Sequence, residues 1–174
     1  MTDSRSQSTY QVRLGWGSDG LARLAPADLV VVVDAIGSSG ALVAEAAALP
    51  FEPTVFSASL RNASATAQAL YDEQLARGGR TAINLVLAGD EGRFAVEDYL
   101  AAGAIAERLS ALGIDHSAPD VAVATEGFRP LTRAVKHLFS ASASGLALAE
   151  QGRKDEAKAA AELDAEAEAR RVAR

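Results

Sequence analysis

A chain of 174 residues with a formal net charge of -6 and no cysteine is long enough to bury the core of one domain. The negative charge and the low aromatic content, 5% of residues, argue against a nucleic-acid binder, because phosphate backbones require a clustered positive surface and single strands require stacking aromatics. The absence of cysteine excludes disulfides, thiolate metal ligands and a cysteine nucleophile. It is compatible with the reducing cytoplasm, where we expect this protein.

The composition divides the chain into a tail, a domain and a charged end. Residues 1–9 are polar and lack the basic and apolar regions of a secretory signal, so we expect a disordered tail there. Residues 10–152 carry the patterns of a single α/β domain. Residues 153–174 are almost entirely Ala, Glu, Asp, Lys and Arg, which predicts a solvated helix or tail. The longest apolar windows, at 29–33 and 40–49, fall far short of the roughly 20 residues of a membrane helix, so no membrane partner is expected.

Strands and helices alternate along the chain. Residues 10–16 alternate apolar and polar side chains, which predicts a half-buried strand. Residues 28–34 hold a run of valines that is apolar on both faces, which is typical of a central strand covered by helices on both sides. Similar patterns predict strands over 54–56 and 81–87, and helices over 20–24, 40–49, 63–77, 96–112, 120–126, 130–141 and 144–151. The alternation predicts a layered α/β/α domain with a mostly parallel or mixed sheet.

The segment over residues 87–98 is the most informative for function. An apolar strand opens into an acidic turn bracketed by Gly89 and Gly92, and the next helix carries Glu97 and Asp98 in its first turn. In open α/β sheets, ligands bind beyond the carboxyl ends of the strands, where such loops and helix starts converge. The two carboxylates could hold a hard cation such as Mg2+. The alternative is that they only complement the helix dipole, which is a common role for acidic residues in a first turn.

Asp34 ends the strongest predicted strand, where a carboxylate can reach a metal or a phosphorylated ligand. The alternative is that Asp34 caps the following helix, although Ser38 and Ser39 are better placed to do so. The loop from Gly37 to Gly40 could offer backbone amides and hydroxyls to an anion. It is not a Walker loop, since no lysine follows its last glycine.

Arg61 and Asn62 lie in a polar cluster between a strand and a helix. They could bind a carboxylate or phosphate through charge-assisted hydrogen bonds. The residues alone favour the alternative, a helix cap beside a solvated arginine. The two histidines, His116 and His137, have no spacing that suggests a metal pair, and we expect them at the surface.

Several segments, taken in order over about positions 10–164, resemble the 2-phosphosulfolactate phosphatase family. The segments are VRLGWG at 12–17, ADLVVVVD at 27–34, SLRNA at 59–63, AGDEGRFAVED at 88–98 followed by AGAI at 102–105, and a weaker match over 142–152. The resemblance implies a Mg2+-dependent phosphatase that hydrolyses a small phosphorylated 2-hydroxy acid to the hydroxy acid and phosphate.

The resemblance also assigns roles to the polar residues picked out above. It implies catalytic roles for Asp34 and Glu97, metal binding by Asp34, Glu97 and Asp98, and substrate binding by Ser38, Ser39, Arg61 and Asn62. Metal-assisted hydrolysis requires such a set, because carboxylates hold the cation and donors stabilise charge on the phosphoryl oxygens.

The chain departs from the family pattern in several places, among them Gly37, which replaces an Arg or Phe of the family. Only a short loop with prolines at 50 and 53 stands where the family has a long insert with polar motifs, and Gly145 is followed by leucine instead of arginine. A fold can persist while its reaction is lost. The alternative function is therefore a catalytically silent relative that binds a small anion or acts as an assembly subunit. The alanine-rich helices are compatible with a homo-oligomer.

Overall fold

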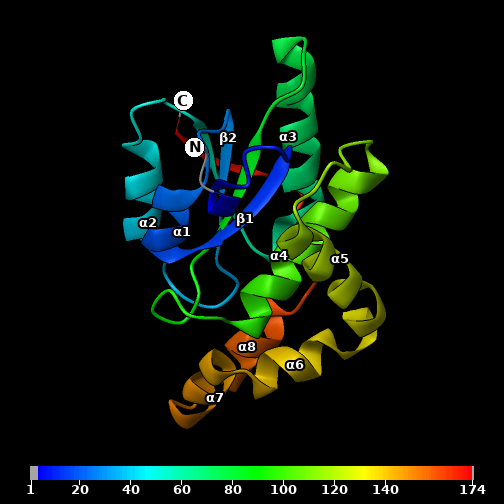
Figure 1. Cartoon of the computed structure of the whole chain (residues 1–174). Coiled ribbons are helices and arrows are strands. Elements are labelled where there is room, and N and C mark those ends of the chain that lie inside the picture. The colour runs from blue at the N-terminus through cyan, green and yellow to red at the C-terminus, as the bar shows by residue number, and fades with distance from the viewer. Residues whose placement is uncertain (1–3, 174) are drawn as a thin grey trace.

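A mixed β-sheet runs through the middle of the computed structural model, which describes residues 4–173 (Figure 1). In this part of the chain the sheet has five strands in the order β1-β4-β2-β3-β5, the first four parallel and β5 antiparallel to β3. The strands are β1 (Val12–Trp16), β2 (Leu29–Val33), β3 (Thr54–Ala58), β4 (Ile83–Leu87) and β5 (Arg170–Ala173). The predicted α/β class with a mixed sheet is confirmed.

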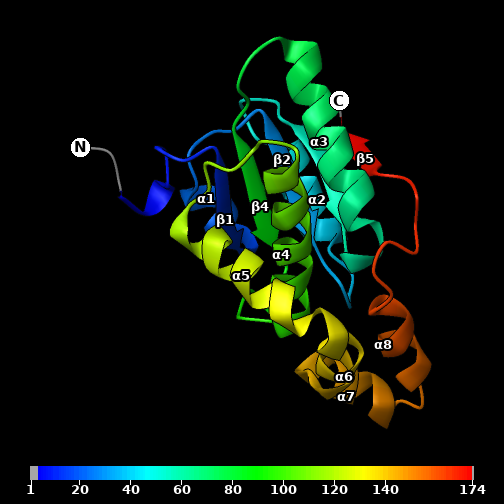
Figure 2. The same cartoon turned by 90° about the vertical axis from the view of Figure 1, so that its right-hand side faces the viewer.

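Helices cover both faces of the sheet (Figure 2). One face carries α1 (Gly17–Arg23) and α2 (Gly40–Ala47), and the other carries α3 (Ala63–Arg77), α4 (Val96–Ala111) and α5 (Pro119–Leu131). Every residue of β2 is buried, because its side chains alternate between the two cores. Val30 and Val32 join the core under α1 and α2, whereas Val31 and Val33 join the core under α3, α4 and α5. None of the helices within residues 4–173 combines the length and apolarity required to cross a bilayer.

The helix α4 lies between the sheet and α5 and is buried on most of its surface. Ten of its residues are buried, which is typical of a helix that is apolar all round. A Cβ atom on Gly103 would lie 2.3 Å from the carbonyl oxygen of Ala124 in α5. The glycine in the Ala-Gly-Ala-Ile segment is therefore required by the close approach of two helix backbones.

Three further helices pack together beyond the carboxyl ends of the parallel strands (Figure 2). They are α6 (Val135–Ala141), α7 (Ala143–Glu150) and α8 (Lys154–Ala160), and short 3-10 turns occupy Ser4–Ser6 (η1), Leu60–Asn62 (η2) and Thr132–Ala134 (η3). The helix predicted over residues 63–77 is present with the same ends, and the elements predicted over 54–56, 81–87 and 96–112 are present with shifted ends.

The two ends of the described chain are folded onto the domain, which differs from the prediction. In residues 4–9, expected to be a disordered tail, Gln7 exchanges two hydrogen bonds with the backbone of Leu14 in β1, at 2.9 and 3.0 Å. Residues 1–3 of the expected tail lie outside the described residues.

Residues 153–174, expected as a solvated helix or tail, include the helix α8 and the edge strand β5, and are mostly exposed. Ala157 and Ala161 are buried. Alanines and ion pairs attach this segment to the rest of the domain, so it requires no large apolar face. Residue 174 is outside the described part.

Candidate active site

The site predicted from the sequence lies where β2 and β4 end side by side. Asp34 follows β2 and Gly89 lies just beyond β4. The chain leaves β2 towards α2 on one face of the sheet and leaves β4 towards α4 on the other face. The loops diverge and leave a crevice, which is the usual position of a ligand site in an open α/β sheet.

Asp98 joins the two loops. Its Oδ1 accepts a hydrogen bond from the backbone N–H of Ala35 and its Oδ2 accepts one from Gly89, each at 2.8 Å. The side chain is 2% exposed. Both carboxylate oxygens therefore bind backbone N–H groups, and Asp98 links the loop after β2 to the loop after β4.

Asp34 and Glu97 lie close enough to Asp98 to affect its charge. The pKa of Asp98 is raised to about 7, mainly by burial and also by the negative charges of Asp34 and Glu97, while the two backbone N–H groups oppose the rise. Burial also raises the pKa of Asp34, with a smaller contribution from Glu97 in the same direction. Asp34, Glu97 and Asp98 therefore lie near one another.

The loop after β2 is shaped around the carboxylate of Asp34. A Cβ atom on Gly37 would lie 2.8 Å from its Oδ1, so only glycine fits there without a shift. A hydrogen bond from Ser39 lowers the pKa of Asp34, against the effect of burial. Ser39 occupies the cap position of α2 but makes no side-chain cap bond. The interpretation of Asp34 as the cap of this helix is therefore wrong.

Glu97 is a buried carboxylate without a hydrogen-bonding or ionic partner among residues 4–173. It is 2% exposed and lines a cavity of about 180 Å3 with Asp90, Phe94 and Ser144 at the start of α7. The carboxylate is therefore accessible from this cavity, where it can take a cation.

The predicted set of three metal ligands is not formed. Within residues 4–173 no three His, Cys, Asp or Glu side chains converge in a way that could hold a metal ion. Each oxygen of Asp98 accepts a backbone N–H group instead. Asp34 and Glu97 remain, and two carboxylates fit Mg2+ provided that water and a substrate phosphate complete its coordination.

The predicted substrate-binding residues divide into two groups. Asn62 is buried, and its Oδ1 accepts the N–H of Ser59 at 2.9 Å, so its capping interpretation is confirmed. Arg61 is not solvated as the alternative supposed, because it pairs with Glu166 at 3.0 Å and with Glu162 at 3.1 Å. Both residues thus have structural partners.

Ser38 lies between two pockets. One, of about 560 Å3, is lined by Ser38, Ser39, Gly89 and Trp16 on the α1 and α2 face. The other, of about 570 Å3, lies between the loop after Asp34 and the helices α7 and α8, and its charged lining residues are Arg61, Arg153 and Glu156. The sequence analysis did not identify Arg153, since only the weak family match over 142–152 pointed to that region.

A two-residue hairpin forms the acidic turn after β4. Asp90 and Arg93 exchange backbone hydrogen bonds at 3.1 and 2.9 Å, and Glu91 and Gly92 between them have φ angles of 51° and 77°. Positive φ at both central residues is the requirement of a type I′ turn.

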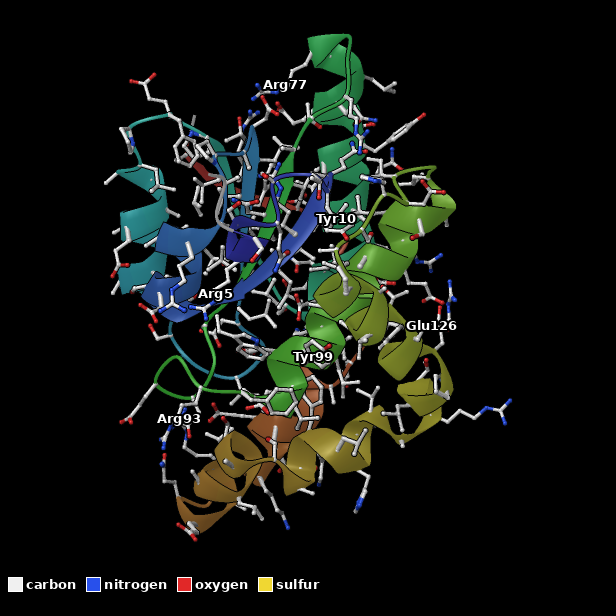
Figure 3. The ribbon with its side chains drawn as sticks, in the orientation of Figure 1. Arg5, Tyr10, Arg77, Arg93, Tyr99 and Glu126 are labelled. Atoms are coloured by element: carbon white, nitrogen blue, oxygen red, sulfur yellow. The ribbon has the colours of Figure 1, made fainter. Side chains whose placement is uncertain are left out.

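Figure 3 shows Arg93 and Tyr99 at the end of the domain near α6 and α7, with Arg77 at the opposite end.

The family model for 2-phosphosulpholactate phosphatase matches residues 37–167, which is most of the chain. The chain belongs to this family. No curated protein matches it. The matched residues of this 2-phosphosulpholactate phosphatase relative begin just after Asp34 and include Glu97, Asp98 and the C-terminal segment with Arg153. The family is one of phosphatases, so its chemistry is the hydrolysis of phosphate esters.

Proposed function

We propose that this protein is a Mg2+-dependent phosphatase that hydrolyses a small phosphorylated 2-hydroxy acid to the hydroxy acid and phosphate. The observation that carries the proposal is Glu97, a buried carboxylate that lines a cavity and lies close enough to Asp34 to raise its pKa. In a member of a phosphatase family, an unneutralised pair of carboxylates at the carboxyl ends of parallel strands is best explained by a cation that arrives with the substrate.

Each residue near the cavity has a role in this proposal. Asp34 and Glu97 would hold Mg2+, which when bound neutralises charge on the phosphoryl oxygens and acidifies water. Asp34 would also take the proton of the attacking water as the water oxygen bonds to phosphorus. The ester P–O bond then breaks, the leaving oxygen takes up that proton, and the hydroxy acid leaves. Asp98 keeps the loops at a fixed separation, and Ser38 and Ser39 supply hydroxyl and amide donors near the phosphate.

A second candidate is a catalytically silent relative that binds a small anion. The observation in its favour is that no cluster of three metal-ligating side chains forms within the described residues. In both cases we propose a cytoplasmic protein with a small anionic ligand and no nucleic-acid partner.

Phosphate release from 2-phospholactate, measured with Mg2+ and with EDTA, tests the proposal. The variants are Glu97→Gln and Asp34→Asn, and Glu107→Gln is the matched control, because Glu107 lies on the same helix but pairs with Arg129. We expect metal-dependent release that Glu107→Gln retains and the other two variants lose. Absence of release from wild type with a native circular dichroism spectrum would overturn the phosphatase and favour the silent relative.

A further inference from the structure

The pocket between the loop after Asp34 and the helices α7 and α8 contains two arginines. Its volume is about 570 Å3, and its wall includes residues 35–38, so it begins one residue beyond the proposed catalytic carboxylate. Arg61 enters from η2 and Arg153 lies just before α8. Ile36 and Leu148 supply apolar contacts in the same pocket. A lining of this kind suits a short carbon skeleton with an anionic group.

The two arginines differ in how firmly they are held. Arg61 binds Glu162 and Glu166 and lies against the backbone of Ala159, so it attaches the C-terminal segment to η2. Arg153 is about half exposed, and within residues 4–173 it is paired only with neighbours in sequence, Glu156 and Gln151. Exposed pairs of this kind contribute little to stability. Arg153 is therefore the arginine that a ligand can recruit.

The contact between Arg153 and Glu156 shows what this guanidinium recognises. Its Nε donates to Oε1 at 2.7 Å and its Nη2 donates to Oε2 at 2.8 Å. Two parallel hydrogen bonds to one carboxylate are the preferred geometry of arginine with a planar oxyanion. Glu156 also lines the pocket, so the chain's own carboxylate occupies the position that a ligand carboxylate would take.

We propose that Arg153 binds the second anionic group of the substrate, a carboxylate or a sulfonate, and that this group displaces Glu156. The inference rests on the proposed function, because it places the phosphate of the same molecule beside Asp34 and Glu97. The site then selects small phosphate esters that carry another oxyanion. Glu156 acts as an internal competitor for that oxyanion.

Two substrates that differ in one group test the proposal. The ester 2-phospholactate carries a carboxylate where isopropyl phosphate carries a methyl group. We expect Arg153→Gln to raise KM for 2-phospholactate about tenfold and to leave KM for isopropyl phosphate unchanged, because a charge-assisted bidentate contact is lost. Glu156→Gln should lower KM for 2-phospholactate, since Arg153 is released. The matched control is Arg129→Gln, because Arg129 makes a similar exposed pair with Glu126 on α5; it should change neither KM.

Equilibrium binding separates failure of this inference from failure of the proposed function. Calorimetric titration of 2-phospholactate in EDTA reports on Arg153 whether or not hydrolysis occurs. If wild type hydrolyses neither ester, the proposed function fails, and weaker binding by Arg153→Gln still supports the subsite. Equal binding by wild type and Arg153→Gln, or equal increases in KM for both esters, would overturn the subsite. A second pair, 2-sulfoethyl phosphate and ethyl phosphate, extends the comparison to a sulfonate. If Arg153→Gln raises KM only for 2-sulfoethyl phosphate, the sulfonate is supported as the group that Arg153 binds.

Discussion

Replacement of Asp98 by asparagine should change how the stability of the protein depends on pH. Burial raises the pKa of Asp98 to about 7 in the folded protein, against 3.8 for an ordinary aspartate. Between these values the folded state binds a proton that the unfolded state has released, so rising pH favours unfolding. From pH 5 to pH 8 the wild type should lose about 3 kcal/mol of unfolding free energy through this group, and the variant should lose none of it.

Urea unfolding at several pH values between 5 and 8, followed by circular dichroism, measures this effect. The quantity of interest is the unfolding free energy of wild type minus that of Asp98→Asn, because titrating groups far from Asp98 cancel in the difference. The asparagine retains only one acceptor for the N–H groups of Ala35 and Gly89, so the variant should be the less stable protein at pH 5. A difference that stays constant with pH, or that grows as pH rises, would refute a raised pKa at Asp98.

Three further predictions concern the cation, the helix contact and the C-terminal segment. With Mg2+ and inorganic phosphate at a hundredfold excess over the Kd of their joint binding, wild type should gain about 2.7 kcal/mol of unfolding free energy in calorimetry, and Glu97→Gln should gain nothing. An equal gain in both proteins would contradict a site at Glu97. Gly103→Ala should lower the free energy of unfolding in urea by about 1–3 kcal/mol, because its Cβ would meet the backbone of α5. Gly127→Ala has open space around the new Cβ and should raise it by about 0.5–1 kcal/mol. Equal effects of the two variants would refute the contact at Gly103. Arg61→Gln should remove about 1 kcal/mol and speed proteolysis near residues 159–166, because two partly exposed ion pairs are lost; an unchanged cleavage pattern would argue against this attachment.

The central strands were predictable, whereas the edge strand was not. Four valines in β2 leave no polar face, which identifies a strand buried between two helical layers. The strand β5 is short, largely exposed and begins with two arginines. Its attachment depends on backbone pairing with β3 and on contacts of Arg171, which lies over the ring of Phe56 and pairs with Glu73 at 2.7 Å. Nothing in the local composition distinguishes such a strand from a solvated tail.

The grouping of Asp34, Glu97 and Asp98 was predictable, but the division of their roles was not. Parallel strands end at one edge of a sheet, so carboxylates after β2 and β4 must approach one another. Which carboxylate links the two loops depends on where the N–H groups of Ala35 and Gly89 point in the folded chain. Arg153 is distant in sequence from residues 35–38, and the fold brings them to the same pocket. No local sequence pattern predicts such a contact.

The strand order has a consequence for folding during synthesis. Within the described residues, β1 has β4 as its only strand neighbour, and β4 also separates β1 from β2. While the first 80 residues emerge from the ribosome, β2 can pair with β3, but β1 has no strand to join. The sheet closes only when residues 83–87 insert between the two, a late and non-local step of the kind that slows folding and exposes strand edges to aggregation.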